Sequence, residues 1–319
     1  MSLSEKIFLS FFKNQKCFES KPHVAVGVSG GPDSMALTYL LNRWIKIKKG
    51  KLYALVFDHS IRFNSLEESY QVKDILKDLN IETFIIKAKK NKLIKKNMAD
   101  ARINRFDGLL NFCNKNNILH LFLGHHFDDN LETYLIRKIN GSNLEGLDSM
   151  NNISYFTSIQ ILRPLIKINK SSIINFNKKY KIKFINDPSN KDINYTRVKV
   201  RNFLQNKNYK KVVQSDFLKL KKKIPDYKKM IWELLIECLV DIQTNRIKIS
   251  FYKLIKFDEL IIEKHILLLL KFLINNKNQT KSSKIKLFID SMKKPSFKIF
   301  NLSGVIIQKN SDFLIFCQK

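Results

Sequence analysis

The stretch HVAVGVSGGPDSMAL, residues 23–37, decides the fold of this chain. Its apolar first half predicts a strand from His23 to Val28, and a glycine-rich turn then leads into a helical pattern. One interpretation is the G-x-S-x-G nucleophile elbow of a hydrolase, in which Ser29 attacks an acyl group. The other is a phosphate-binding loop at the N-terminus of a helix. The two interpretations predict unrelated enzymes.

The hydrolase interpretation lacks its partner residues. A nucleophile elbow needs an acid and then a His later in the chain. The only His after His126 is His265, which lies in the apolar helical stretch EKHILLLLKFLI, where a structural role is expected. The elbow also leaves Asp33 and Ser34 without a function. The rest of the chain therefore disfavours this interpretation.

The phosphate-binding interpretation uses every residue of the loop. Its two glycines let backbone N–H groups approach an anion, and its two serines add hydroxyl donors. Pro32 suits the first turn of the helix, whose N-terminal dipole attracts negative charge. Asp33 would repel a bare phosphate, so it predicts either a Mg²⁺ ion or a structural hydrogen bond within the loop. A plain strand–turn–helix junction with a Ser or Asp cap is the alternative.

Around this loop, apolar strands alternate with amphipathic helices from residue 23 to about 126. The alternation predicts an α/β fold, a doubly wound parallel sheet with helices on both faces. Because ligands bind beyond the carboxyl ends of such strands, the polar segments 29–34, 58–62 and 125–132 are singled out. The predicted strands are His23–Val28, Leu52–Phe57, Ile81–Lys87, Ile118–Gly124 and Gln160–Pro164.

The residue pattern of the sequence changes after about residue 212. We expect the parallel sheet in residues 1–215 and a smaller α+β domain in residues 216–319. In the latter, a lysine run precedes a helical section through Asn276, and the last stretch alternates like short strands around turns at Gly304 and at 310–312.

The composition points to a polyanionic partner. The chain has 319 residues with 58 Lys and Arg against 28 Asp and Glu, a formal net charge of +30. This excess favours nucleic acid or an anionic membrane, although an AT-rich genome also enriches lysine. No apolar run is long enough to cross a membrane, so we expect no membrane partner and a cytoplasmic protein. The scattered cysteines form no C-x-x-C pair, which argues against zinc and iron–sulfur sites.

Several motifs carry a family resemblance. The loop Ser29–Ser34 matches S-G-G-x-D-S, and the chain thereby resembles the N-type ATP pyrophosphatases of the PP-loop superfamily. The segment LGHHFDDNLETYLIRKINGSNLEGLDSM, residues 123–150, resembles the H-x-x-D-D-Q-x-E-T…R…G-x-x-G-L-x-x-M segment of tRNA(Ile)-lysidine synthetases. Asn130 and Val198 depart from that family's pattern, which has Gln and Asn there. Further stretches extend the resemblance to about residues 23–204: FDHSIRFNSLEE, NMADARINRF, LRPLI and INDPSNKDINYTR.

The resemblance implies a tRNA-modifying ligase. ATP would adenylate the wobble cytidine of tRNA(Ile) with a CAU anticodon, and free L-lysine would then displace AMP at C2. The lysidine so formed changes the codon specificity from AUG to AUA. ATP is then a substrate, Mg²⁺ accompanies it, residues 1–215 form the catalytic PP-loop domain, and residues 216–319 bind tRNA. The oligomeric state stays open, a homodimer included. The alternatives are another PP-loop tRNA-modifying enzyme such as a thiolase, and a non-catalytic RNA-binding protein.

The resemblance also implies the site residues. The carboxylates would bind the lysine ammonium or take its proton, although the Asp129–Glu132 spacing also suits a helix capping box. Arg197 would stabilise phosphate charge or contact a tRNA phosphate. The residues expected to act in catalysis are Asp33, Asp128, Asp129, Glu132 and Arg197, with Asp33 also expected as a Mg²⁺ ligand. Those expected to bind ATP are Ser29, Gly30, Gly31, Pro32, Asp33, Ser34, Asp58 and Arg102.

Overall fold

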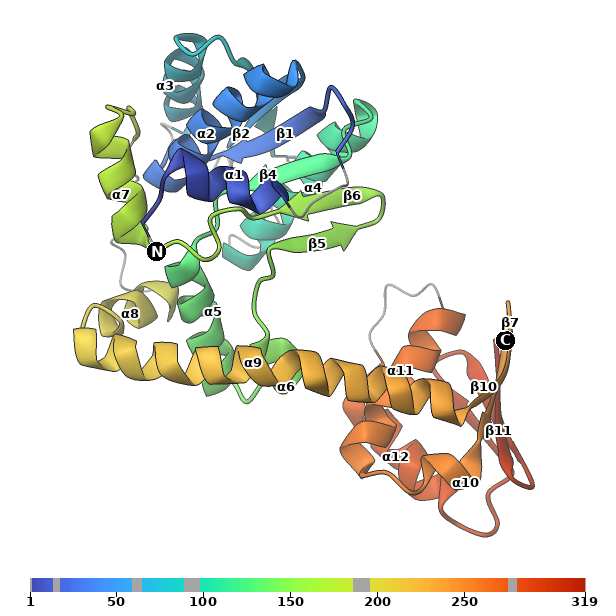
Figure 1. The fold of residues 1–319 in the computed structure, drawn as a ribbon. Coiled ribbons are helices and arrows are strands. Elements are labelled where there is room, and N and C mark those ends of the chain that lie inside the picture. Colours follow the sequence, from blue (N-terminus) through green and yellow to red (C-terminus); the bar gives the residue numbers. More distant parts are fainter. Residues whose placement is uncertain are drawn as a thin grey trace. The chain divides into compact units, whose positions relative to one another are not determined.

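The computed structural model describes residues 2–13, 18–58, 65–88, 98–185, 196–274 and 280–318. The chain divides into two compact units, Met1–Leu218 and Lys219–Lys319 (Figure 1). A continuous helix, α9 (Lys207–Cys238), begins in the first unit and ends in the second.

The first unit contains a six-stranded sheet with the order β3-β2-β1-β4-β6-β5. Neighbouring strands run parallel except at the edge, where β5 pairs antiparallel with β6. The strands are β1 (His23–Val28), β2 (Lys51–Asp58), β3 (Glu82–Lys87), β4 (His120–Leu123), β5 (Ile153–Phe156) and β6 (Ile159–Leu162). The predicted fold class is confirmed. The sequence did not predict β5, because it has four residues and two of them, Tyr155 and Phe156, are exposed.

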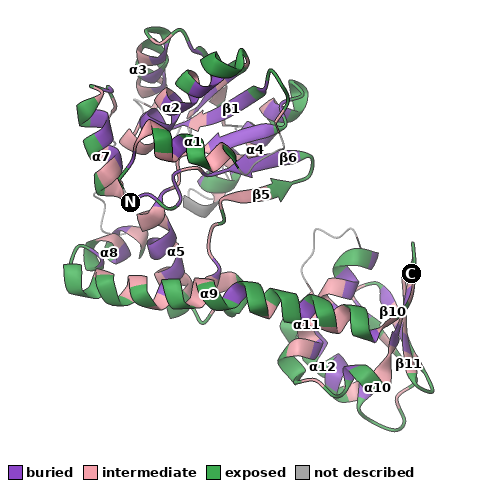
Figure 2. Cartoon of the chain, viewed as in Figure 1, coloured by how far each residue is buried: buried purple, intermediate pink, exposed green. Residues whose placement is uncertain are grey.

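Helices cover both faces of this sheet, as a doubly wound fold requires. One face of β1 packs in a cluster with α1, α2, α3 and α7, and the other face packs with α4. Both faces are therefore apolar, and Figure 2 shows the central strands as buried. The helices of this unit that precede α9 are α1 (Glu5–Lys13), α2 (Pro32–Lys48), α3 (Ser65–Lys77), α4 (Met98–Lys115), α5 (Phe127–Ile139), α6 (Leu144–Leu147), α7 (Lys170–Lys179) and α8 (Thr196–Phe203).

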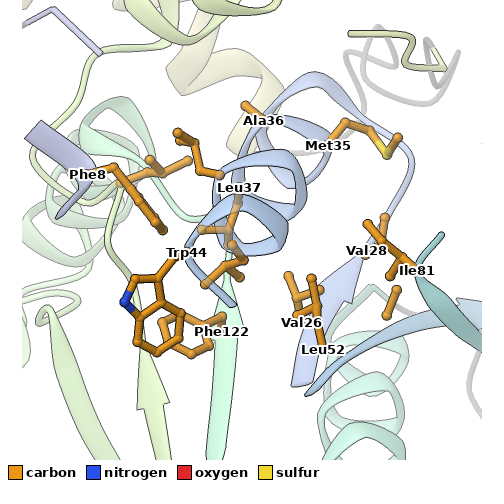
Figure 3. Packing of buried hydrophobic residues seen from close by; sticks show 14 of the residues in the cluster. Phe8, Val26, Val28, Met35, Ala36, Leu37, Trp44, Leu52, Ile81 and Phe122 are labelled. Atoms are coloured by element: carbon orange, nitrogen blue, oxygen red, sulfur yellow. The ribbon is translucent and has the colours of Figure 1, made fainter. Parts of the chain in front are cut away.

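The N-terminal helix α1 closes one side of the core. Its amphipathic pattern buries Phe8, which is 2% exposed, and brings Phe12 against Trp44 of α2, with ring centroids 4.2 Å apart and planes 13° apart. Figure 3 shows Phe8, Trp44 and Phe122 gathered on the same side of the sheet. The short helix is therefore anchored by aromatic packing.

The order of the strands has a switch point at β1. This strand pairs with β2 on one side and with β4 on the other, so the connections leave it in opposite directions. Ligands of open α/β sheets bind at such a switch point, beyond the carboxyl ends of the strands. The segments after β1 and β4 approach closely there, since a Cβ on Gly124 would lie 3.1 Å from the backbone nitrogen of Ser34.

The second unit is a five-stranded antiparallel sheet, of order β7-β8-β11-β10-β9, with the helices α10, α11 and α12 and the last part of α9. Its elements are β7 (Leu239–Gln243), β8 (Arg246–Ser250), α10 (Phe251–Leu254), α11 (Glu259–Leu273), α12 (Ser282–Met292), β9 (Ile299–Leu302), β10 (Val305–Asn310) and β11 (Phe313–Gln318). The predicted helical section is interrupted by the β7–β8 hairpin, whose isoleucines alternate with polar residues. The predicted turn at Gly304 is confirmed: Ser303 and Gly304 have φ of 54° and 89°. No helix in the described ranges is long and apolar enough to span a bilayer.

Candidate active site

The loop after β1 is shaped by glycine and by two facing hydroxyls. Gly30 has φ of +79°, a Cβ there would lie 2.6 Å from Cγ2 of Val72, and its carbonyl accepts a hydrogen bond from the Ile185 backbone N–H at 2.9 Å. The Ser34 hydroxyl donates to the Gly31 carbonyl at 3.0 Å and accepts from the Ser29 N–H at 3.2 Å. These bonds fix a compact turn that any residue with a side chain at position 30 would strain.

The helix α2 begins at this loop without a side-chain cap. Pro32 is its first residue, and the N-cap, Gly31, offers no side chain to the N–H groups of the first turn. The N-terminus of a 17-residue helix therefore points uncapped donors and its positive dipole toward the switch point. The loop Ser29–Ser34 thus has the features of an anion site.

Asp33 stands beside these donors with one oxygen engaged and one not. Its Oδ2 forms an ion pair with Nζ of Lys170, the first residue of α7. Its Oδ1 is buried and has no hydrogen-bond partner among the described residues, while Nε2 of His126 lies 3.6 Å away. Mg²⁺ in nucleotide sites is held by one or two carboxylates together with phosphate oxygens. The free oxygen of Asp33 fits that role, and no cluster of three or more metal-binding side chains exists in the described part of the chain.

The helix α5 opens with a capping box formed by His126 and Asp129. Nδ1 of His126 accepts from the Asp129 N–H at 3.4 Å, and Oδ2 of Asp129 accepts from the His126 N–H at 3.0 Å. The box begins three residues before the Asp129–Glu132 pair that the sequence indicated.

Three carboxylates surround this imidazole. Oδ1 of Asp33 and Oδ2 of Asp129 lie 3.6 Å and 3.5 Å from Nε2, and Oδ2 of Asp128 lies 3.9 Å from Nδ1. His126 itself is buried. The side chain therefore joins the loop after β1 to the acidic first turn of α5.

Arginines from α8 hold the remaining carboxylate oxygens. Arg197 donates through Nη2 to Asp129 and through Nε to Glu132, both at 2.7 Å. Arg201, one turn further on, donates through Nε to Glu132 at 2.8 Å. The Glu132 side chain is 4% exposed, so two guanidinium groups compensate its burial.

Asp128 is held from two other elements. Its Oδ2 accepts from the Lys170 backbone N–H at 2.7 Å, and its Oδ1 forms an ion pair with Nζ of Lys210 on α9. Burial raises the pKa of Asp128, but these bonds outweigh it and bring the pKa below its ordinary value. For Asp129 burial likewise raises the pKa, while His126 and Arg197 lower it further than burial raises it. Both carboxylates are therefore ionised at neutral pH.

Two further residues of the expected ATP site come from other elements, β2 and α4. Asp58 ends β2 at the same edge of the sheet; it is buried, and its Oδ1 accepts from the Ser65 hydroxyl at 2.7 Å. Arg102 on α4 lies within electrostatic range of the cluster: desolvation and then the charge of Arg197 lower its pKa, while Asp129 raises it. The motif stretches at 59–64 and 186–195 fall outside the described residues.

Sequence reasoning missed three cations of the site, Lys170, Arg201 as a partner of Glu132, and Lys210. Lys170 lies 137 residues from its partner Asp33, and Lys210 lies 82 residues from Asp128. In a chain with 58 Lys and Arg, no local pattern marks a particular cation as paired. Only the fold identifies these three.

A second group of basic side chains lies within electrostatic range of Arg102. Burial lowers the pKa of Arg105 and of Arg163 to about 10, and in each the nearby Arg102 charge adds to the effect. Arg163 donates through Nη1 to the Asn151 carbonyl at 3.1 Å. Burial also lowers the pKa of His125 to about 3; Asp129 opposes this, and the Arg163 charge reinforces it. His125 is therefore neutral at physiological pH.

The neutral state of His125 predicts a pH dependence of stability. Its pKa is about 3 in the folded chain and about 6.5 when unfolded, so between these values the unfolded chain binds more protons. The free energy of unfolding is expected to fall by about 1.4 kcal/mol per pH unit as the pH drops below about 6. Urea unfolding at pH 7.5 and pH 5 measures this difference. In the His125→Gln variant, the stability of the first unit should depend less on pH. An equal loss of stability between pH 7.5 and pH 5 in that variant would contradict the assignment of the effect to His125.

Asn130, where the family resemblance has Gln, ties α5 to the segment after α6. Its Oδ1 accepts from the Met150 N–H at 2.8 Å and its Nδ2 donates to the Met150 carbonyl at 3.1 Å, with the side chain buried. We expect Asn130→Ala to lower the free energy of unfolding by about 2 kcal/mol, because two partly buried backbone groups of Met150 lose their partner. Thermal unfolding measures it. Asn116→Ala, which removes an exposed bond to the Phe112 carbonyl, should change stability far less.

Val198, the other departure from the resemblance, is 8% exposed and lies on the buried side of α8. Its neighbours Arg197 and Arg201 make their carboxylate contacts without a polar side chain at position 198. The substitution therefore leaves the described ion pairs intact.

Comparisons relate this chain to known proteins. Residues 2–208 match the family model described as the PP-loop domain. A tRNA(Ile)-lysidine synthase of Orientia tsutsugamushi (strain Boryong) is 37% identical over 188 residues, which are 59% of this chain and 42% of the relative. One of Rickettsia prowazekii (strain Madrid E) is 31% identical over 247 residues, 75% of this chain and 56% of the relative. The chain spans about half the length of these curated relatives.

A solved structure shares the fold. The U34-tRNA thiolase NcsA from Methanococcus maripaludis, with its 4Fe-4S cluster, superposes with a TM-score of 0.56 over 68% of this chain and 77% of the other, at 19% identity. At that identity the likeness concerns the fold alone.

Proposed function

Because the chain belongs to the PP-loop domain family, we propose that it uses ATP to join free L-lysine to the wobble cytidine of tRNA(Ile) with a CAU anticodon. The observation that carries the proposal is the convergence of Asp33, Asp128 and Asp129 around His126, with N···O distances of 3.6, 3.9 and 3.5 Å. This imidazole links a nucleotide loop to carboxylates suited to an amine. A reaction that first activates an oxygen with ATP and then binds an amine needs both a nucleotide loop and carboxylates for the amine.

In the first step, the loop Ser29–Ser34 and the uncapped start of α2 bind the β- and γ-phosphates of ATP. The cytidine O2 attacks the α-phosphorus, the bond between the α-phosphorus and the bridging oxygen breaks, and pyrophosphate leaves. Lys170 and the α2 dipole stabilise the negative charge that leaves with it. Mg²⁺, held by the free oxygen of Asp33, would neutralise phosphate charge when bound.

In the second step, the ε-amine of lysine attacks C2 of the adenylated cytidine and AMP departs. A free lysine ammonium has a pKa of about 10.4 and must lose a proton before it attacks. Asp128 and Asp129 are ionised and so can bind the ammonium and accept that proton. Arg197, placed between Asp129 and Glu132, adds positive charge where AMP leaves.

The second unit is proposed to hold the body of the tRNA. Lys219, Lys222 and Lys223 are exposed on α9, and such lysines bind RNA phosphates without reading sequence. Affinity for tRNA should then fall steeply as the salt concentration rises.

The decisive experiment supplies labelled lysine. The chain is incubated with ATP, Mg²⁺, radiolabelled L-lysine and a tRNA(Ile) transcript with a CAU anticodon; acid-insoluble label and AMP are expected in equal amounts. A CAU-bearing methionine tRNA transcript serves as the control substrate. Absence of label with the isoleucine transcript would refute the proposal. Sulfur incorporation from a thiocarboxylate donor, without any need for lysine, would instead support the thiolase alternative.

A further inference from the structure

Two aromatic rings stack on the surface at the corner between α8 and α9. The ring centroids of Phe203 and Tyr209 are 4.7 Å apart and their planes differ by 10°. The two residues are 46% and 51% exposed, and Val212, one helical turn beyond Tyr209, is 69% exposed. The pair therefore presents aromatic surface to solvent instead of contributing to the core.

The backbone fixes this corner independently of the rings. The Asn206 side chain accepts hydrogen bonds from the N–H groups of Asn208 and Tyr209, at 2.9 Å and 3.3 Å, and so caps the start of α9. Leu204 anchors the turn in the core at 7% exposure. The rings are thus held in place before any ligand arrives.

The pair lies on the two helices that supply cations to the carboxylate cluster. Arg201 on α8, two residues before Phe203, donates to Glu132 at 2.8 Å. Lys210 on α9, directly after Tyr209, forms the ion pair with Asp128. The corner that carries the rings is thus tied to the cluster through neighbouring residues, while the rings themselves stay exposed.

The charge around the rings identifies what they contact. The segment 196–211 contains no Asp or Glu, and its basic residues are Arg197, Lys199, Arg201, Lys207, Lys210 and Lys211. An aromatic face set among cations fits a nucleic acid strand, because the cations pair with phosphates while a base stacks on the ring. Arg197, Arg201 and Lys210 already pair with the site carboxylates, so the exposed Lys199, Lys207 and Lys211 are the cations that phosphates can reach, and an apolar protein surface would offer them no partner.

We propose that the Phe203–Tyr209 pair is a stacking platform for an unpaired nucleobase adjacent to the cytidine that reacts. The proposal deepens the proposed function and rests on its RNA substrate. Stacking of a neighbouring base fixes the RNA strand beside the carboxylates, so the reactive base enters the site while its neighbour stays outside. Recognition by stacking is tolerant of base identity, which makes the platform a positioning device for the anticodon loop.

The test uses the full chain and an anticodon stem–loop RNA that carries 2-aminopurine next to the wobble cytidine. Stacking on an aromatic ring quenches 2-aminopurine fluorescence, so binding of the unaltered chain should quench it. Phe203→Leu and Tyr209→Ala should lose the quenching and bind the RNA about tenfold more weakly. Tyr209→Phe should retain both. Tyr70→Ala is the matched control, because Tyr70 is also 51% exposed but lies on α3.

Two results would overturn the platform. One is unchanged quenching and affinity in the Phe203→Leu and Tyr209→Ala variants. The other is a loss of affinity that follows a lowered melting temperature, which would make the pair a clamp for the helix corner. The experiment also separates this proposal from the proposed function. If RNA binding quenches 2-aminopurine in a way that depends on Tyr209 but no lysidine is formed, the proposed function fails and the stacking platform is still supported. Lysidine formed by Tyr209→Ala with an unchanged KM for tRNA removes it.

Discussion

Replacement of Asp33 by asparagine is expected to lower ATP-dependent pyrophosphate release about 1,000-fold. The amide keeps the size of the side chain but removes the charge that pairs with Lys170 and replaces one of the two carboxylate oxygens with an NH2 group. Asp33→Ala should abolish the reaction. RNA affinity should stay close to that of the unaltered chain, because neither change touches α8 or α9. A coupled pyrophosphate assay and a filter-binding assay measure the two quantities.

The control for Asp33 is Asp78→Asn. Asp78 also pairs with a lysine, Lys183 at 3.7 Å, but both side chains are largely exposed, so the pair contributes about 1 kcal/mol or less to stability. This variant should release pyrophosphate at the unaltered rate. Full activity of Asp33→Ala would remove Asp33 from the mechanism.

Replacement of Glu132 by alanine is expected to have the largest effect on stability. It leaves the guanidinium groups of Arg197 and Arg201, which are 34% and 39% exposed, without their shared carboxylate. Loss of one partner in a buried ion pair costs about 3–5 kcal/mol, and because both arginines reach solvent we expect the lower end, about 3 kcal/mol. The melting temperature of the first unit should therefore fall by about 8 °C, as measured by calorimetry. Lysidine formation should be lost as well.

Glu132→Gln separates charge from hydrogen bonding. The amide oxygen still accepts from one arginine, so stability should recover in part while lysidine formation stays low. Glu67→Gln, at an exposed position of α3, should change stability by about 0.5 kcal/mol or less. A Glu132→Ala variant as stable as the unaltered chain would contradict the role of the arginine pair.

The sequence predicted those elements of the fold that have a clear local residue pattern. Strand β1 was predicted at its observed bounds, because an apolar run that ends in glycines has few alternatives. The edge strand β5 was not, since four half-exposed residues carry no periodicity. The β7–β8 hairpin lies between two helices and was included in a predicted helical section, although Ile247 and Ile249 alternate with polar residues.

The candidate site, like the fold, was predicted only in part. The acidic members Asp33, Asp128, Asp129 and Glu132 stand in motifs, so their positions were identifiable. Their roles in the reaction remain our proposals. The pairing of each acid with a particular cation depends on helices α7, α8 and α9 reaching the same carboxylates. That convergence is a property of the tertiary fold and leaves no trace in local spacing.

The central position of β1 also governs when the site can form during folding. Val24 pairs with Leu52, a contact made soon after synthesis, but also with His120, almost a hundred residues later. Contacts between distant residues form slowly, because a long loop must close before they stabilise anything. A nascent chain therefore holds the glycine loop long before the acidic helix α5 can dock beside it. The proposed nucleotide site is thus complete only late in the maturation of this protein, once the long-range half of the sheet has closed.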